Sequence, residues 1–423
     1  MNANTAFIGP ILPALLLGCA SPKEKATPGS EGAPSIAWHV GQGTDLEEHV
    51  HEGVQTSDGG YIAIGHTSES GSSKTDVLTI KVDSGGSLEW QRIYGAAGGW
   101  DVGIAVIEVE DGFVAAGGLD VSGTQKPALI KHNPSGVEMW TKTFDLSGVG
   151  MIRGIAALSD GGLVVTGFYG GEESGFVFIS DESTGFVAKL NDNGDVIWRE
   201  DINGPQGTKI RETSDGGFAV LSTVWVDEGG IDVQNAAIIK LNSSGELEWR
   251  QTYGGGNNQA FDFDLAPTGE FLIAGHTTGF GAANWDCIMT KVDSDGTLIW
   301  QQVFGQPREY DAKYIHDECY GIRVDSDGGY VMAGGTGNET AGYSDGGHPA
   351  GSASEWKAYV VKTDADGEVL WQQVYGDGAD NGHNAAEFLT LSDDGGYLLL
   401  NDSDSIGEME PNNFGFMKLA AEP

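Results

Sequence analysis

The chain is built from a repeated unit of about 50 residues, which restricts it to a small set of repeat architectures. The first complete copy spans residues 58–95. It begins with an Asp-Gly-Gly turn and continues with an apolar run from Tyr61, a second run over residues 77–82 and a third that ends at Trp90. Short apolar runs separated by Gly-containing turns are typical of β-strands. The spacing favours the blades of a β-propeller.

Seven copies of the second-strand pattern can be recognised, and none shows sustained helical periodicity. They begin at Tyr61, Phe113, Leu163, Phe218, Phe271, Tyr330 and Tyr397. Nearly unbroken apolar runs indicate strands that are buried on both faces, as in stacked blades. The third strand of each copy carries one lysine: Lys81, Lys131, Lys189, Lys240, Lys291, Lys362 and Lys418. We expect these lysines to pair with nearby acids.

Six copies continue, after a turn containing glycine, into a fourth strand that carries a tryptophan. These residues are Trp90, Trp140, Trp198, Trp249, Trp300 and Trp371, and we expect them to wedge between blades. The seventh copy ends after Leu419, but the segment Ile36-Ala37-Trp38 precedes the first copy. Residues 36–423 are therefore predicted to form an all-β, seven-bladed propeller of four-stranded antiparallel blades. The N-terminal strand would close the ring and remove its exposed edges.

The segment from Lys291 to Trp300, KVDSDGTLIW, resembles the tryptophan-docking repeat of quinoprotein-like (PQQ-like) propellers. The whole repeat, over residues 36–419, also resembles the tandem DGGY repeats of secreted bacterial and archaeal proteins. Kelch propellers are the alternative family. Quinoprotein dehydrogenases hold their quinone with a vicinal disulfide and a calcium site. This chain has no Cys-Cys pair, so the resemblance implies the fold and no cofactor.

The N-terminus is predicted to be a targeting segment. Residues 1–18 contain a short apolar run that ends in Leu16-Leu17-Gly18-Cys19, which resembles the lipobox of bacterial lipoproteins. That resemblance implies lipidation of Cys19, a flexible tether over residues 19–35 and, with Ala20 next, an outer-membrane location. The segment before the apolar run lacks the usual Lys or Arg, so an ordinary signal peptide with an incidental cysteine is the alternative.

The net charge of −40 argues against nucleic acid and against direct contact with anionic membranes. We therefore expect membrane contact only through the lipid anchor. The expected partner is a glycan, a peptide or an envelope protein, and the expected state is a monomer.

No metal or catalytic site is predicted. Paired acids in Gly-containing turns resemble calcium loops but supply too few oxygens, so calcium remains only an alternative. These pairs are Asp293/Asp295, Asp325/Asp327 and Asp364/Asp366. Residues 342–346 match a nucleophile-elbow pattern by chance, because they lie in a polar loop. Arg153, Arg211 and Arg323 are scattered over different blades, which disfavours a sialidase-type arginine cluster.

Cys287 and Cys319 could form a disulfide or remain as two free thiols. They fall in strands of successive blades that we do not expect to be neighbours. Only the irregular segment between them could then bring the Cα atoms within about 7 Å.

The longest irregular segments are predicted to emerge on one face of the propeller. They span residues 169–184, 224–234, 305–318 and 336–355. Trp225, Trp285 and Trp356 lie in or beside them, and we predict that these rings line a shallow ligand site. Further candidates are Tyr310, Tyr314, Tyr343, Arg308, Asp311, His316 and Glu318. The alternative is that these loops fold over their own aromatic residues.

These features predict a non-catalytic, lipid-anchored propeller of the cell envelope that binds a ligand or a protein. Two alternatives stay open. One is an envelope assembly scaffold that resembles the propeller lipoprotein of the barrel-assembly machinery, and the other is a glycan-active hydrolase or lyase.

Overall fold

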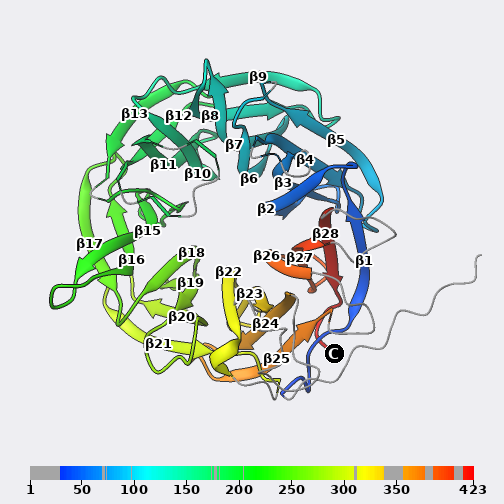
Figure 1. Ribbon diagram of the computed structural model, residues 1–423, viewed down its shortest axis with the longest axis vertical. Coiled ribbons are helices and arrows are strands. Elements are labelled where there is room, and N and C mark those ends of the chain that lie inside the picture. Colours follow the sequence, from blue (N-terminus) through cyan, green and yellow to red (C-terminus); the bar gives the residue numbers. More distant parts are fainter. Residues whose placement is uncertain are drawn as a thin grey trace, which may run out of the picture.

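The computed structural model describes residues 29–423, except 69–71, 73, 97, 173, 176–178, 181, 203, 309–311, 338–355, 377–383 and 404–412. Its strands form seven four-stranded antiparallel sheets arranged as blades around a central channel (Figure 1). The predicted all-β, seven-bladed propeller is confirmed. The signal-peptide and Cys19 predictions lie outside the described residues, as does most of the predicted tether.

The strands of each blade follow one another from the channel outward. Blades 1 and 2 contain β2 (Glu47–Gln55), β3 (Tyr61–Ser68), β4 (Asp76–Val82), β5 (Leu88–Tyr94), β6 (Val102–Val109), β7 (Gly112–Val121), β8 (Thr124–His132) and β9 (Glu138–Thr143). Blades 3 and 4 contain β10 (Val149–Ala157), β11 (Leu163–Gly171), β12 (Thr184–Leu190), β13 (Val196–Asp201), β14 (Lys209–Glu212), β15 (Phe218–Asp227), β16 (Asp232–Leu241) and β17 (Leu247–Tyr253).

The remaining three blades have the same order. Blades 5 and 6 contain β18 (Asn258–Leu265), β19 (Phe271–Thr277), β20 (Asp286–Val292), β21 (Leu298–Phe304), β22 (His316–Val324), β23 (Tyr330–Gly337), β24 (Lys357–Thr363) and β25 (Val369–Tyr375). Blade 7 contains β26 (Asn384–Leu391), β27 (Tyr397–Ser403), β28 (Asn413–Leu419) and β1 (Ile36–Gln42). A 3-10 helix, η1 (Ala312–Tyr314), precedes β22.

The N-terminal strand closes the ring as predicted. β1 pairs antiparallel with β28, and Trp38 lies opposite Lys418 in the register. The pairing continues past the strand, because the Ala420 amide donates a 2.9 Å hydrogen bond to the Ser35 carbonyl. Blade 7 therefore combines strands from both ends of the chain, and β28 is paired on both of its sides.

The fourth-strand tryptophans bridge neighbouring blades. Each of six indoles lies against the glycine of the following blade's outer turn, where φ is between 74° and 87°. A Cβ atom added at these glycines would lie only 2.6–3.2 Å from the ring. The pairs are Trp38–Gly86, Trp90–Gly136, Trp140–Gly194, Trp198–Gly245, Trp249–Gly296 and Trp300–Gly367. In the first blade the turn contains two glycines, and the one with positive φ is the second, Gly86.

The third-strand lysines pair with acids of their own blades, as predicted. In five blades the partner is the aspartate of the Asp-Gly-Gly turn, as in Lys240–Asp215 at 2.8 Å and Lys418–Asp394 at 2.9 Å. Asp215 also accepts a hydrogen bond from the Gly217 amide, so one carboxylate both fixes the turn and neutralises the lysine. The repeated residues are therefore structural.

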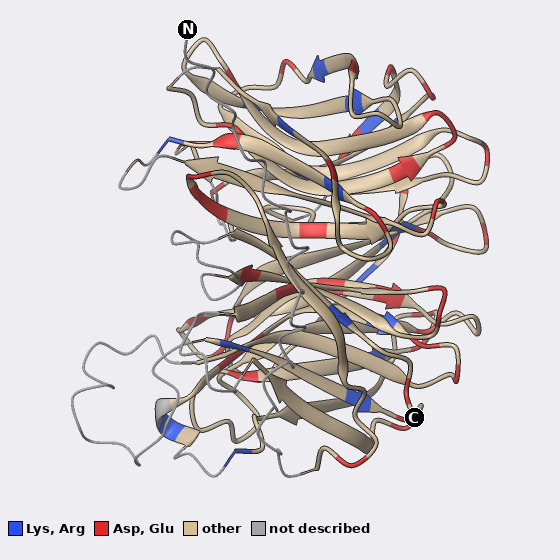
Figure 2. Ribbon diagram, turned by 90° about the vertical axis from the view of Figure 1, so that its right-hand side faces the viewer, with Lys and Arg blue, Asp and Glu red and all other residues tan. Residues whose placement is uncertain are grey.

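Acidic residues outnumber basic ones over the ring, as Figure 2 shows in red and blue. Among the described residues, no helix is long and apolar enough to cross a membrane.

Ring closure predicts a large effect of removing β1. Deletion of residues 1–45 removes the β1–β28 ladder and the Trp38 wedge, interactions on the order of 5 kcal/mol. The melting temperature should fall by roughly 10 °C, at about 2 °C per kcal/mol for a large domain. Thermal unfolding followed by circular dichroism measures it. Deletion of residues 1–28 is the control and should leave the transition unchanged; equal melting temperatures for the two proteins would contradict this role of β1.

Candidate functional site

The innermost strand of each blade faces the channel, and a β-bulge redirects one of its side chains. The register between the first and second strands shifts by one residue in six blades. The extra residues are His51, Ile104, Arg153, Phe261, Tyr320 and Glu387. In blade 4, Thr208 holds the matching position just before β14. A bulge turns an additional side chain out of the alternating pattern of its strand.

All seven of these residues line one cavity in the channel, together with Lys209 and Phe388. Its volume is about 50 Å³. We call this constriction, formed by one residue from each blade with Lys209 and Phe388, the throat. Its lining mixes charged, hydroxyl and aromatic side chains, although each blade has the same backbone.

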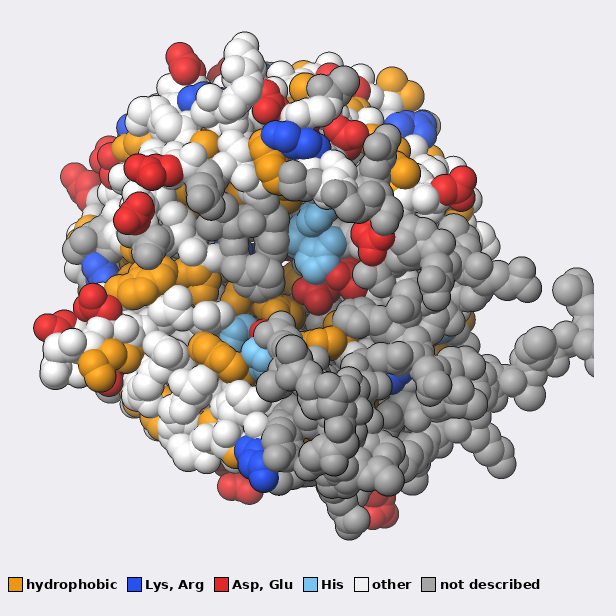
Figure 3. All heavy atoms as spheres, in the orientation of Figure 1, with side chains coloured by type: hydrophobic (Ala, Val, Ile, Leu, Met, Phe, Trp, Pro, Cys, Tyr) orange, Lys and Arg blue, Asp and Glu red, His pale blue; other side chains and the backbone are white. Residues whose placement is uncertain are grey.

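At the mouth of the channel, above the throat, blade 1 groups three histidines beside an aspartate of blade 7. The ring centroids of His49, His51 and His66 lie 4.6–5.4 Å apart, and His51 Nε2 is 3.1 Å from His66 Nδ1. Asp402 of β27 contacts His49 Nδ1 and accepts a 2.9 Å hydrogen bond from the Val50 amide. Figure 3 shows histidine side chains, in pale blue, beside the central opening.

Burial and nearby charges push these groups in opposite directions. Burial opposes a charge on His49, but the charge and hydrogen bond of Asp402 raise its pKa to about 9. Burial and the charge of His49 lower the pKa of His66 to about 3. Burial raises the pKa of Glu387 to about 8. Near neutral pH these shifts favour a protonated His49 at the mouth and a protonated Glu387 in the throat.

Blades 5 and 6 form the other side of the mouth, where aromatic rings continue from the rim to the throat. Trp285 stacks on His316 with centroids 5.9 Å apart, and His316 lies 5.7 Å from Trp356. Trp285 also packs edge-on against His276 at 5.0 Å. We call the set Trp285, His316, Trp356 and His276 the aromatic array. His276 stacks on Phe261, which lines the throat, so the array and the throat are continuous.

Polar groups border the aromatic array. His316 Nε2 lies 3.1 Å from Glu318 Oε1, and the Tyr320 hydroxyl donates a hydrogen bond to the same carboxylate. Burial alone would raise the pKa of Glu318, but the hydrogen bond with His316 and the nearby imidazoles lower it to about 2. His276 Nε2 and Gln259 Oε1 are 2.8 Å apart. These contacts fix the rings and place an ionised carboxylate at the rim.

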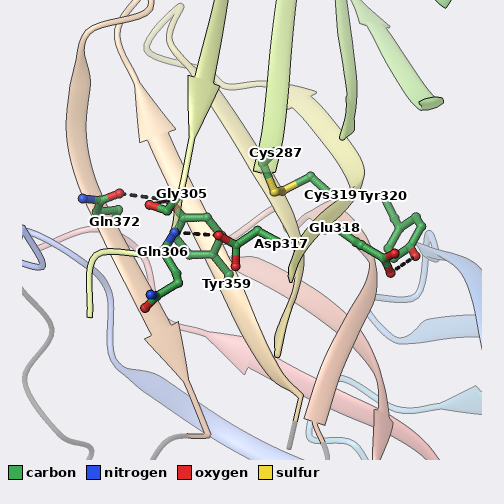
Figure 4. The surroundings of a disulfide bond; sticks show 9 residues. All are labelled: Cys287, Gly305, Gln306, Asp317, Glu318, Cys319, Tyr320, Tyr359 and Gln372. Carbon is green, nitrogen blue, oxygen red and sulfur yellow. Dashed lines mark hydrogen bonds between the residues drawn. A yellow bond between two sulfur atoms is a disulfide. The ribbon is translucent and has the colours of Figure 1, made fainter. Parts of the chain in front are cut away.

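The structure joins Cys287 of β20 to Cys319 of β22 in a disulfide with Cα atoms 5.3 Å apart (Figure 4). The expectation that only the irregular segment could bring them together is wrong. Blades 5 and 6 stack face to face, so both cysteines fall in one buried core cluster. The disulfide anchors β22 next to Glu318 and Tyr320, which are labelled on the same strand in Figure 4.

The predicted ligand residues divide into three groups. Trp285, Trp356, His316 and Glu318 come together at the mouth. Trp225 lies on β15 opposite Gln234, and among the described residues it makes no ring contact with the other two tryptophans. Tyr310, Asp311, Tyr343 and the side chain of Tyr314 lie outside the described residues.

Arg308 has a structural role. Its side chain is buried, Nε donates to Gln306 Oε1 at 2.7 Å, and Nη2 donates to Thr336 Oγ1 at 3.0 Å. These bonds hold the segment before η1 against β23. The prediction that Arg308 contributes a polar group to the ligand site stays a prediction.

Sequence reasoning missed the throat. It treated Arg153, Arg211 and Arg323 as scattered, yet all three belong to innermost strands, and Arg211 and Arg323 lie 3.8 and 2.5 Å from the same carboxylate, Asp262. A signal was present in the sequence. The one throat residue that each blade contributes stands at the same distance in sequence before the turn that joins the first two strands of that blade. His51 precedes Asp58 and Arg153 precedes Asp160 in this way.

A larger cleft lies on the opposite face and has a different origin. Glu110 and Asp111 alone connect β6 and β7, in place of the longer Asp-Gly-Gly turn. The shorter turn leaves a volume of about 770 Å³ between blades 1 and 3. Its carboxylates have structural partners, since Glu108 accepts from Ser57 and Asp111 pairs with Lys131. We assign no function to this cleft.

The fold defines the class of protein as a seven-bladed β-propeller, and solved structures agree. The chain is similar to the WD40 domain of Neurospora crassa Pan2, at 10% identity over 91% of this chain and 95% of that domain, with a TM-score of 0.54. It is similar to the WD40 β-propeller domain of Doa1, at 10% identity over 92% and 97%, with a TM-score of 0.53. At these identities the likeness establishes the fold alone.

A protein of unknown function from Bacteroides caccae shares 14% identity over 71% of this chain and 89% of its own, with a TM-score of 0.41. No family model matches the chain, and no curated protein matches it.

The histidine group predicts a loss of stability as the pH rises. His49 has a folded pKa of about 9 against 6.5 in the unfolded chain, and Glu387 has about 8 against 4.5. In both cases the folded state binds more protons, so the free energy of unfolding should fall between about pH 6.5 and 9. Chemical unfolding at several pH values measures this slope.

Asp402→Asn removes the charge that raises the pKa of His49 and should flatten the slope. His39→Gln is the matched control, because burial lowers the pKa of His39 to about 4, outside this range. A wild-type stability that rises from pH 6.5 to 9 would contradict the assignment.

Proposed function

We propose that this protein is a non-catalytic, lipid-anchored propeller of the cell envelope that binds a glycan or peptide at the mouth of its channel. The observation that carries the proposal is the aromatic array. Two tryptophans from successive blades converge on one histidine at the mouth, outside the structural repeat. We further propose kinship with the quinoprotein-like and DGGY-repeat propellers, supported by the docking of six fourth-strand tryptophans on turn glycines.

The array has the composition of a ligand site. Trp285 and Trp356 are half-buried, so part of each indole remains accessible. One side of Trp356 packs on Gly335 and Gly337 of β23, which holds the ring in place. Aromatic faces with a few polar groups at their border suit sugar rings and peptide side chains. Glu318 and Gln259 supply polar groups beside the rings.

The glycan-active hydrolase remains the alternative with one observation in its favour. Glu318 and Glu387 are close enough for the charge of Glu318 to contribute to the raised pKa of Glu387. One carboxyl group is therefore ionised and the other protonated at neutral pH. Such pairs are used for acid–base chemistry, although structural networks produce them as well.

Substitution of the array tests the binding function. Trp356→Ala should abolish or weaken by at least about tenfold the binding seen with wild type on glycan and peptide arrays, since an aromatic anchor at a binding site contributes on the order of 2 kcal/mol. Trp100→Ala is the matched control. Trp100 is also half-buried and outside the repeat, but it packs against Lys74 and Gly175, and its loss should leave binding intact.

Unchanged binding by a folded Trp356→Ala protein would place the site elsewhere. Release of new reducing ends from a captured glycan, lost in Glu387→Gln, would replace the binding proposal with the hydrolase.

Lipidation at Cys19 is tested in a bacterial host. Mass spectrometry of the mature protein should show a diacylglyceryl cysteine at its N-terminus, and the protein should fractionate with membranes. Cys19→Ala should move it to the soluble fraction, while a serine substitution at Ala20 should leave it anchored. A soluble product that retains Met1 would contradict the anchor.

A further inference from the structure

The throat is lined on one side by two buried cations. Arg153 of β10 is 5% exposed and Lys209 of β14 is 8% exposed, and both line the cavity. Burial lowers the pKa of Arg153 to about 10, so the guanidinium stays charged at neutral pH. A chain with a net charge of −40 thus places cationic side chains at the centre of its ring. Burying a charge costs several kcal/mol unless other groups compensate it.

Carboxylates near the throat pair with one of its two cations and with two arginines outside the cavity. Lys209 pairs with Glu52, and Arg211 and Arg323 both lie against Asp262. The positive charges of Arg153 and Lys209 also reach across the cavity, because they help to lower the pKa of His51 well below its usual value. Arg153 and Lys209 therefore both lie at the cavity on the side of blades 3 and 4, and Glu52 offsets the charge of Lys209.

The remaining polar groups of the throat can donate hydrogen bonds. Glu387 lines the opposite side, and burial raises the pKa of its carboxyl group to about 8, which favours the protonated form at neutral pH. The hydroxyl of Thr208, which is 3% exposed, lines the cavity next to Lys209. A guanidinium, an ammonium group, a hydroxyl and a carboxylic acid thus surround one small space. That set of donors is complementary to an oxyanion.

The size of the cavity restricts the anion. A volume of about 50 Å³ is several times the 10–15 Å³ that one water needs, so it admits a group of a few heavy atoms. A planar carboxylate matches both this space and the fork of an arginine. The aromatic array leads from the rim to Phe261 and Tyr320 in the throat, which gives the rest of a ligand a continuous path.

We propose that the throat is a carboxylate-binding site, in which Arg153 and Lys209 hold the acid group of a ligand whose body lies on the aromatic array. The ligand class is therefore an acidic sugar or an acidic peptide. The assignment of the ligand body rests on the proposed function, whereas binding of the carboxylate in the throat does not.

Acetate is the probe for the throat alone. Titration calorimetry at constant ionic strength, with sodium chloride as the reference salt, should detect acetate binding to wild type. Arg153→Met should weaken that binding at least about tenfold, since a charge-assisted hydrogen-bonded pair is lost. Arg199→Met is the matched control, because Arg199 lies on the outer strand β13 of the same blade, paired with Asp201, and should keep full affinity.

A second measurement does not depend on a variant that folds. Crystals of the wild-type protein soaked in sodium acetate should show planar carboxylate density in the throat, within hydrogen-bond distance of Arg153 and Lys209. Density only elsewhere would overturn the proposal. Equal acetate affinity in a folded Arg153→Met protein, or tighter binding of sulfate than of acetate in the throat, would also overturn it.

The two proposals fail separately. Trp356→Ala should keep the wild-type affinity for acetate but lose binding of the ligand identified on the glycan or peptide arrays. If acetate binds in the throat while Trp356→Ala still binds the ligand identified on the glycan or peptide arrays, the throat site stands and the proposed site on the aromatic array fails. If Arg153→Met keeps both acetate and acidic ligands, the throat site fails regardless of the array.

Discussion

The contact between a fourth-strand tryptophan and the turn glycine of the next blade, made at six of the seven junctions, holds the ring together. An indole can approach the backbone so closely only where no Cβ intervenes, and the positive φ of the turn independently favours glycine. One residue therefore satisfies both the turn and the docking. Trp38 continues the series across the junction between the chain ends, so the strand that closes the ring also provides the last wedge.

A rigid ring of equivalent blades allows the channel to vary. The lysine–aspartate pairs and the docked tryptophans fix the outer part of each blade, while a bulge in the first strand turns one side chain into the throat. The bulge position accepts residues as different as Arg153, Ile104 and Glu387, because its side chain borders the cavity. Chemical diversity is thus concentrated where the blades contribute least to one another's packing.

The mouth and the throat differ in physical character. Stacked rings from blades 5 and 6 offer apolar faces, held in place by the Glu318 contacts and the disulfide at Cys319. The throat presents hydrogen-bond donors and two cationic side chains, Arg153 and Lys209, in contrast to the acidic exterior. Its chemistry depends on burial, because the same arginine and carboxyl group on the surface would be solvated and screened. A ligand that spans both regions would cover the apolar faces of the rings at the mouth and pair with the cations of the throat.

The sequence by itself determined the repeat, the number of blades, the strand that closes the ring and the roles of the repeated tryptophans and lysines. These follow from local periodicity and from turns that need glycine. It also indicated Trp285, Trp356, His316 and Glu318 as residues outside the repeat. Only the tertiary structure decided that Trp225 makes no ring contact with those tryptophans, that Arg308 bonds to Gln306 and Thr336, and that Cys287 reaches Cys319. It also decided that Arg153, Lys209, His51 and Glu387 share one cavity, because bulge register and blade stacking bring together residues far apart in the chain.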